Sequence, residues 1–117
     1  SRGTPVYAAH DGTIMGCNGD GGHYDTSFAV GEFFDDSYGN VIQIQGSDGT
    51  NTYSTIYGHL EYVLVSPCQT VAKGQQIGTV DDTGDSTGNH LHFEYRGGGS
   101  VYNILPEGLT VGSCYGG

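Results

Sequence analysis

A length of 117 residues allows one domain with one hydrophobic core, and 13 acidic residues against three basic ones give a formal charge of −10. This charge argues against nucleic acids and anionic membrane surfaces as partners, because both would repel the chain. Hydrophobic residues make up only 35% of the sequence, and its 22 glycines and 9 tyrosines are typical of short strands joined by turns. No apolar run approaches the roughly 20 residues of a membrane span.

Strand and turn signals alternate along the chain. Apolar residues 4–9 and 13–17 flank the sequence His-Asp-Gly, which predicts a hairpin turn, and residues 18–39 predict a long polar loop. Because no helical period persists for ten residues, the sequence predicts an all-β fold. The later strand signals lie at residues 40–45, 52–60, 61–65, 70–80, 90–95 and 101–105.

The stretch GNHLHFEY predicts a strand with two histidines on one face. Successive strand residues point to opposite faces, so Leu91 and Phe93 would face a core while His90, His92 and Glu94 face away from it. The two imidazoles would lie roughly 7 Å apart, close enough to share a metal or a reacting water. A pair of exposed strand histidines without a function is the alternative.

The three cysteines, Cys17, Cys68 and Cys114, are too widely spaced for a zinc knuckle. One disulfide plus an odd cysteine is the expected arrangement, which indicates an extracellular origin. The odd cysteine would be free, or would pair with another chain or a missing segment. Since the sequence opens without a methionine, we interpret it as a mature or partial product of a longer precursor.

Three stretches, RGTPVYAAHDGTI, STIYGHL and VAKGQQIGTVDDTGDSTGNHLHFEY, together resemble the lysostaphin/LytM-type zinc metalloendopeptidases over most of residues 2–96. The resemblance implies a twisted, mostly antiparallel sheet or sandwich with a groove walled by loops, in a peptidase-like domain at residues 1–105 followed by a tail at 106–117. It also implies an extracellular hydrolase of peptide cross-links in bacterial cell walls, with zinc as cofactor and a cell-wall peptide as partner.

The resemblance assigns roles to three histidines. His92 matches the zinc-ligand position, while His90 and His59 match residues that orient or deprotonate the zinc-bound water and stabilise the oxyanion. This division suits a catalytic zinc, which uses three protein ligands and leaves a position for water. The family takes its other two ligands from a His-x-x-x-Asp stretch just before RGTPVYA, and residues 1–4 contain neither residue type.

The sequence therefore leaves two alternative functions. A zinc endopeptidase requires the upstream ligands in the full-length protein. The alternative is an inactive extracellular binding or structural module on the same fold, which self-associates through an unpaired sheet edge or the odd cysteine.

Other side chains are weaker candidates for the missing ligands. His10 and Asp11 are expected to decorate a turn, and His23 and Asp25 to lie in the loop that borders the groove. His59 is close enough to replace a ligand.

Three further residues have expected roles. Glu94 is expected either to bond an imidazole or to be exposed, and Tyr57 to pack under the groove. Since Cys17 and Cys68 lie inside the part that matches the family, they are the expected disulfide pair.

Overall fold

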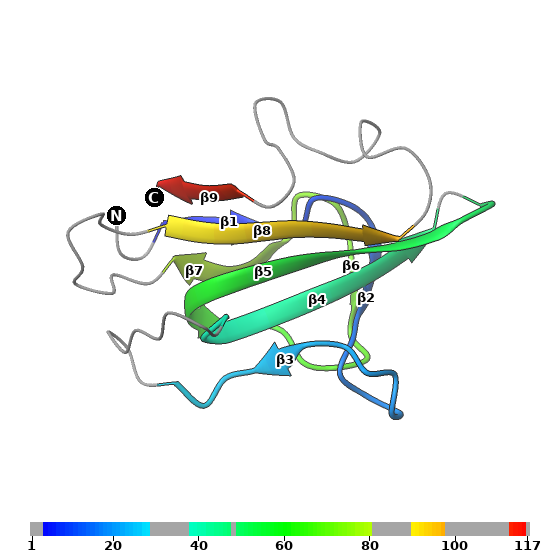
Figure 1. The fold of residues 1–117 in the computed structure, drawn as a ribbon, viewed down its shortest axis with the longest axis horizontal. Helices are drawn as coiled ribbons and strands as arrows, with labels where there is room; N and C mark the ends of the chain where they lie inside the picture. The colour runs from blue at the N-terminus through cyan, green and yellow to red at the C-terminus, as the bar shows by residue number, and fades with distance from the viewer. Residues whose placement is uncertain (1–3, 29–37, 48, 81–89, 98–112, 117) are drawn as a thin grey trace.

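The structure is a computed structural model, and it describes residues 4–28, 38–47, 49–80, 90–97 and 113–116 (Figure 1). All regular secondary structure in these ranges is β-strand, which confirms the predicted all-β fold. No helix within them has the length and hydrophobicity needed to cross a bilayer. The strands are β1 (Pro5–Tyr7), β2 (Gly12–Ile14), β3 (Tyr24–Asp25), β4 (Asn40–Ser47), β5 (Thr52–Val63), β6 (Thr70–Val71), β7 (Gln76–Val80), β8 (His90–Gly97) and β9 (Ser113–Gly116).

The strands form one curled antiparallel sheet around the long strand β5. Its backbone path runs β1-β7-β5-β4-β2-β6, with β3 added to β4, β8 to β5 and β9 to β8. One edge of β5 pairs with β4, whereas β8 and β7 share the other edge, β8 along the first half of β5 and β7 along its end. Figure 1 shows β4, β5 and β8 as long neighbouring strands.

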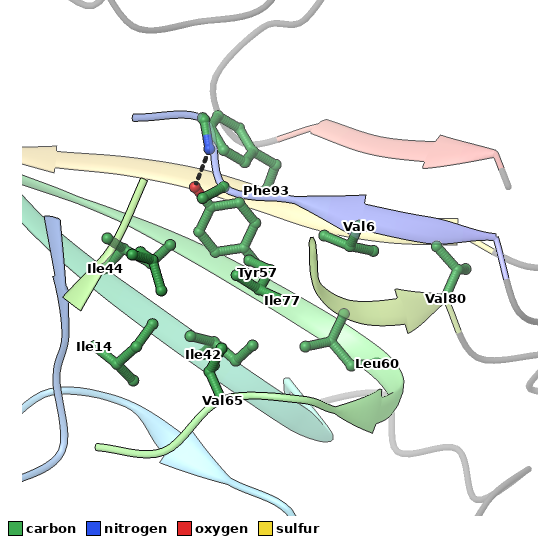
Figure 2. Close-up of a cluster of buried hydrophobic side chains, with 13 residues drawn as sticks. Val6, Ile14, Ile42, Ile44, Tyr57, Leu60, Val65, Ile77, Val80 and Phe93 are labelled. Atoms are coloured by element: carbon green, nitrogen blue, oxygen red, sulfur yellow. Dashed lines mark hydrogen bonds between the residues drawn. The ribbon is translucent and has the colours of Figure 1, made fainter. Parts of the chain in front are cut away.

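The core lies on one face of these strands. Isoleucines from β2, β4 and β7 pack with Tyr57 of β5 and Phe93 of β8, all 1% exposed or less (Figure 2). The rings of Tyr57 and Phe93 meet edge to face at a centroid distance of 5.4 Å. Alternation along each strand directs one row of side chains into this core and the other row to the opposite face, where Ile56 and Gln43 are also buried.

The predicted hairpin around Asp11 is wrong. Strand β1 pairs with β7, and β2 pairs with β4 and β6, so β1 and β2 are not partners. The connection between them instead runs through the interior, where Ala8, Ala9 and His10 are all buried. Burial of this segment outweighs the local turn preference of Asp-Gly.

Other sequence predictions on the strands are confirmed or refined. The strand signals at 40–45 and 52–60 correspond to β4 and β5, whose pairing continues to Ser47 and Thr52. The signals at 52–60 and 61–65 belong largely to one strand, β5. The division into a domain at 1–105 and a tail at 106–117 stays a prediction, although β9 within that tail pairs with β8.

A chain of buried polar groups crosses the core near Tyr57. The Tyr57 hydroxyl accepts a hydrogen bond from the Ala9 amide at 3.1 Å (dashed in Figure 2) and lies 2.7 Å from Thr55 Oγ1. Thr55 in turn lies 2.8 Å from His10 Nε2, and His10 Nδ1 donates to the Asp11 carbonyl at 2.7 Å. Burial lowers the pKa of His10 and raises the pKa of Tyr57 to about 12, so both groups are neutral at pH 7.

Tyr57→Phe is expected to lower the free energy of unfolding at pH 7 by about 1–3 kcal/mol, because it leaves the Ala9 amide buried without its partner. Because the pKa of Tyr57 is about 12 in the folded state and near 10 in the unfolded state, the wild-type chain keeps its full stability below pH 10 and loses this contribution as pH rises towards 12. The deficit of the variant should therefore shrink between pH 10 and 12. Urea unfolding at both ends of this range measures it, with Tyr7→Phe, at a 55% exposed tyrosine, as control. A deficit that does not change with pH would contradict the assignment.

Candidate functional site

The face of the sheet opposite the core is organised in rows across β4, β5 and β8. One row pairs Gly58 with His92, and the next pairs Ile56 with Glu94. Phe93, between His92 and Glu94 on β8, is 1% exposed and points into the core. The predicted division of β8 into a core face and a polar face is thus confirmed for the side chains that the structure describes.

His59 and His92 lie together at one end of this face. Their ring centroids are 6.1 Å apart with the rings nearly perpendicular. His92 projects from β8 in line with Gly58, and His59 follows Gly58 on β5. The side chain of His90, predicted to join them, lies outside the described residues.

The backbone of His59 adopts a left-handed conformation with φ of 59°, and its amide donates to the Tyr38 carbonyl at 2.6 Å. The pairing of β5 with β7 shifts register just beyond it, between Leu60 and Tyr62. Left-handed geometry costs a non-glycine residue roughly 1–2 kcal/mol, and such strain persists only where the surroundings impose it. The irregularity turns the His59 imidazole towards His92.

His59→Gly is expected to be more stable than His59→Ala by about 1 kcal/mol, because both remove the imidazole but only glycine relieves the left-handed strain. Thermal or urea unfolding of the two variants measures the difference. A His59→Ala variant as stable as His59→Gly would show that the conformation carries no strain.

A hydrogen-bonded network holds the His92 ring. His92 Nε2 lies 2.8 Å from Glu94 Oε1, which also accepts from the Tyr38 hydroxyl at 2.9 Å. Arg96 donates to Glu94 Oε2 from Nε and Nη2, both at 3.3 Å, and to the Tyr38 hydroxyl at 3.0 Å. Although burial opposes it, the hydrogen bonds from His92 and Tyr38 hold the pKa of Glu94 below its usual value. Glu94 is therefore an imidazole partner, one of its two predicted roles, and a bond from His92 to a metal would use Nδ1.

Tyr38 is a site residue that the sequence analysis missed. Its ring centroid lies 5.5 Å from that of His92 and 5.1 Å from that of His23. A Cβ added at Gly58 would lie 3.2 Å from Tyr38, so a glycine at this strand position lets the tyrosine approach. Tyr38 belongs to an aromatic-containing loop without periodicity, and the glycine before His59 was the one local signal of a close approach.

The structure separates the remaining candidates from one another. His23 borders the site through Tyr38, and its backbone amide donates to Gln43 Oε1 at 2.9 Å. Asp25 instead accepts hydrogen bonds from Ser27. His10 is buried and hydrogen-bonded to Thr55, so its interpretation as turn decoration is wrong.

Asp11 accepts from the Lys73 amide at 2.8 Å and so ties the β1–β2 connection to the turn before β7. The core-buried Tyr57 packs on the other side of the sheet from the histidines, as predicted.

A zinc ion does not fit the described residues by themselves. They contain no group of three or more histidine, cysteine, aspartate or glutamate side chains arranged to hold a metal. His92 can supply one ligand, but a stable zinc site takes three or four. Further ligands would have to come from outside the described residues.

The predicted disulfide between Cys17 and Cys68 is confirmed, with their Cα atoms 5.9 Å apart. It continues the pairing of β2 with β6, next to the hydrogen bond from the Cys68 amide to the Ile14 carbonyl. The bond therefore fastens the short last strand of the sheet path to its neighbour. The Cys114 side chain lies outside the described residues.

The curled, mostly antiparallel sheet is the fold of the lysostaphin-type peptidases. The chain belongs to peptidase family M23, whose sequence profile matches residues 1–104. Its structure matches the catalytic domain of lysostaphin from Staphylococcus simulans with a TM-score of 0.58 and 28% identity, over 91% of this chain and 68% of that one. It also matches a zinc-containing peptidase from Vibrio cholerae with a TM-score of 0.57 and 32% identity, over 81% of this chain and 24% of that one.

Similar sequences include named peptidoglycan enzymes. Peptidoglycan DD-endopeptidase ShyA of Vibrio cholerae is 34% identical over 95% of this chain, and DD-carboxypeptidase/endopeptidase Mpg of Neisseria meningitidis is 37% identical over 94% of it. The chain spans 22% of the length of ShyA and 21% of the length of Mpg. The relationship thus covers nearly all of this chain but about a fifth of each relative.

Proposed function

We propose that this domain hydrolyses peptide bonds in the cross-links of bacterial cell walls, as a zinc metalloendopeptidase of the lysostaphin/LytM type. The observation that carries the proposal is the placement of the His59 and His92 imidazoles 6.1 Å apart, on the face of the sheet opposite the core. Membership of a peptidase family and relatives named as peptidoglycan endopeptidases support the choice of bond and substrate.

The histidines have distinct proposed roles. His92, held by Glu94, is the metal ligand of this chain, and zinc would activate water for attack on the peptide carbonyl. His59 moves a proton or stabilises the developing negative charge, with His90 as a second such group. Neutral and protonated imidazole suit both tasks near pH 7.

Activity requires two ligands beyond the described residues, because these hold no complete metal site. This requirement favours a second candidate function, an inactive binding or structural module of the cell envelope. Strands β1 and β6 lie at the two ends of the sheet path and are three and two residues long, and their short edges could pair with another chain. In either case we propose action outside the cytoplasm, where the Cys17–Cys68 bond persists.

Digestion of purified peptidoglycan by the longest natural protein that contains this domain tests the proposal. Release of new amino termini, identified by mass spectrometry, is the expected result. His59→Ala should reduce the rate by about 100-fold or more, as for loss of a general base or oxyanion donor. Lys73→Ala, on the connection between β6 and β7, is the matched control. Binding of the same peptidoglycan without any cleavage would favour the module.

A further inference from the structure

The open face of the sheet continues beyond the histidines into a cavity of about 260 Å³. The row that follows Glu94 along the strands pairs Gln45 with Ser54 and Ser54 with Arg96. Arg96 is four residues beyond His92 on the same face of β8, or about 13 Å along the strand. Residues lining the cavity include Met15, Gln43, Gln45, Thr52, Ser54 and Arg96.

The cavity combines one cation with neutral hydrogen-bonding groups. Amides and hydroxyls surround Arg96, and no carboxylate occurs among the described residues that line it. The other cation of the described chain, Lys73, lies on the connection between β6 and β7. Glu94 lies 3.3 Å from Arg96 and balances part of its charge, so a further anion would bind through the exposed part of the guanidinium and the surrounding amides and hydroxyls.

The guanidinium of Arg96 is held by hydrogen bonds on one side and remains partly exposed to solvent. Glu94 and Tyr38 engage its Nε and Nη2 atoms, and the side chain remains 50% exposed. The hydrogen bonds to Glu94 and Tyr38 use Nε and Nη2 and do not use Nη1. Fixing one edge of a planar guanidinium reduces the ordering cost when the other edge binds a carboxylate.

We propose that this cavity binds a carboxylate of the peptide substrate through Arg96, on the same face of β8 as His92. Glu94 bridges the two side chains, with Oε1 2.8 Å from His92 Nε2 and Oε2 3.3 Å from Arg96 Nη2, so the guanidinium lies within a few residues of an extended peptide from the imidazole. The inference rests on the proposed function for the identity of the ligand as a peptide. The carboxylate is either the chain terminus or an acidic side chain, which present the same group to the guanidinium.

Binding to the 117-residue chain tests the proposal without any cleavage. The probes are tetra-alanine with a free carboxylate, its C-terminal amide, and an amidated tetrapeptide with one internal glutamate, titrated by NMR. At least one carboxylate-bearing peptide should bind roughly 10- to 100-fold more tightly than the tetra-alanine amide, the range for a hydrogen bond to a charged group. Which of the two shows the preference distinguishes the terminal from the side-chain carboxylate.

Three variants assign the preference to the cavity. Arg96→Gln should abolish it, and Lys73→Gln should leave it unchanged. Gln45→Glu places a negative charge in the cavity at an exposed position without touching Arg96, and should also abolish it. Equal affinity for all three peptides, no binding at millimolar concentration, or a preference retained in Arg96→Gln would overturn the proposal. If the chain shows the carboxylate preference but the protein cuts no peptide, the binding site is supported and the proposed hydrolysis is contradicted.

Discussion

After dialysis against metal-free buffer, the 117-residue chain is expected to retain little zinc and to cut no cell-wall peptide. His92 is the single position that the family resemblance predicts to be a zinc ligand, and the described residues hold no group of three candidate ligands. One imidazole cannot compete with water and buffer for zinc, since protein zinc sites depend on several ligands in defined geometry. Metal analysis by mass spectrometry, with intact mass to define the chain, measures the outcome.

The same measurement on a longer natural protein that carries an upstream His-x-x-x-Asp stretch is expected to give one zinc per chain together with activity. In that protein His92→Ala should abolish both, whereas His59→Ala should keep the metal and lose turnover by about 100-fold or more. Stoichiometric zinc in the 117-residue chain would contradict the prediction and would mean that His59, His23 or an aspartate has been recruited.

Removing the Cys17–Cys68 disulfide is expected to lower the free energy of unfolding by about 4 kcal/mol, in the chain-entropy model for a loop of this size. The bond joins residues 51 positions apart and fastens the two-residue strand β6 to β2. Urea unfolding of the double variant Cys17→Ala/Cys68→Ala measures the loss.

Cys114→Ala is the matched control, because it removes the cysteine outside this bond. It should leave the unfolding midpoint unchanged, and the wild-type midpoint should fall on addition of reductant. A double variant as stable as the wild type would show that the pairing of β2 with β6 does not depend on the cross-link.

Local patterns in the sequence were sufficient for the strands and for part of the site. The period of two in HLHFEY predicted that His92 and Glu94 share a face and that Phe93 is buried, and both hold. Such patterns are reliable because side-chain direction in a strand follows from backbone geometry alone. The proximity of His59 to His92 was available only through the resemblance to a family. Strands β5 and β8 pair with each other, but β6 and β7 separate them in the sequence, and no local pattern predicts that pairing.

The tertiary structure decided what pairs with what. It buried His10 against Thr55, separated β1 from β2, and brought Tyr38 beside His92 through the space left by Gly58. None of these follows from a local signal, because strand partners are chosen by the burial of apolar surface between segments far apart in the chain. The sequence by itself thus determined an all-β chain with a histidine-bearing face, and only the packed sheet determined which groups surround those histidines.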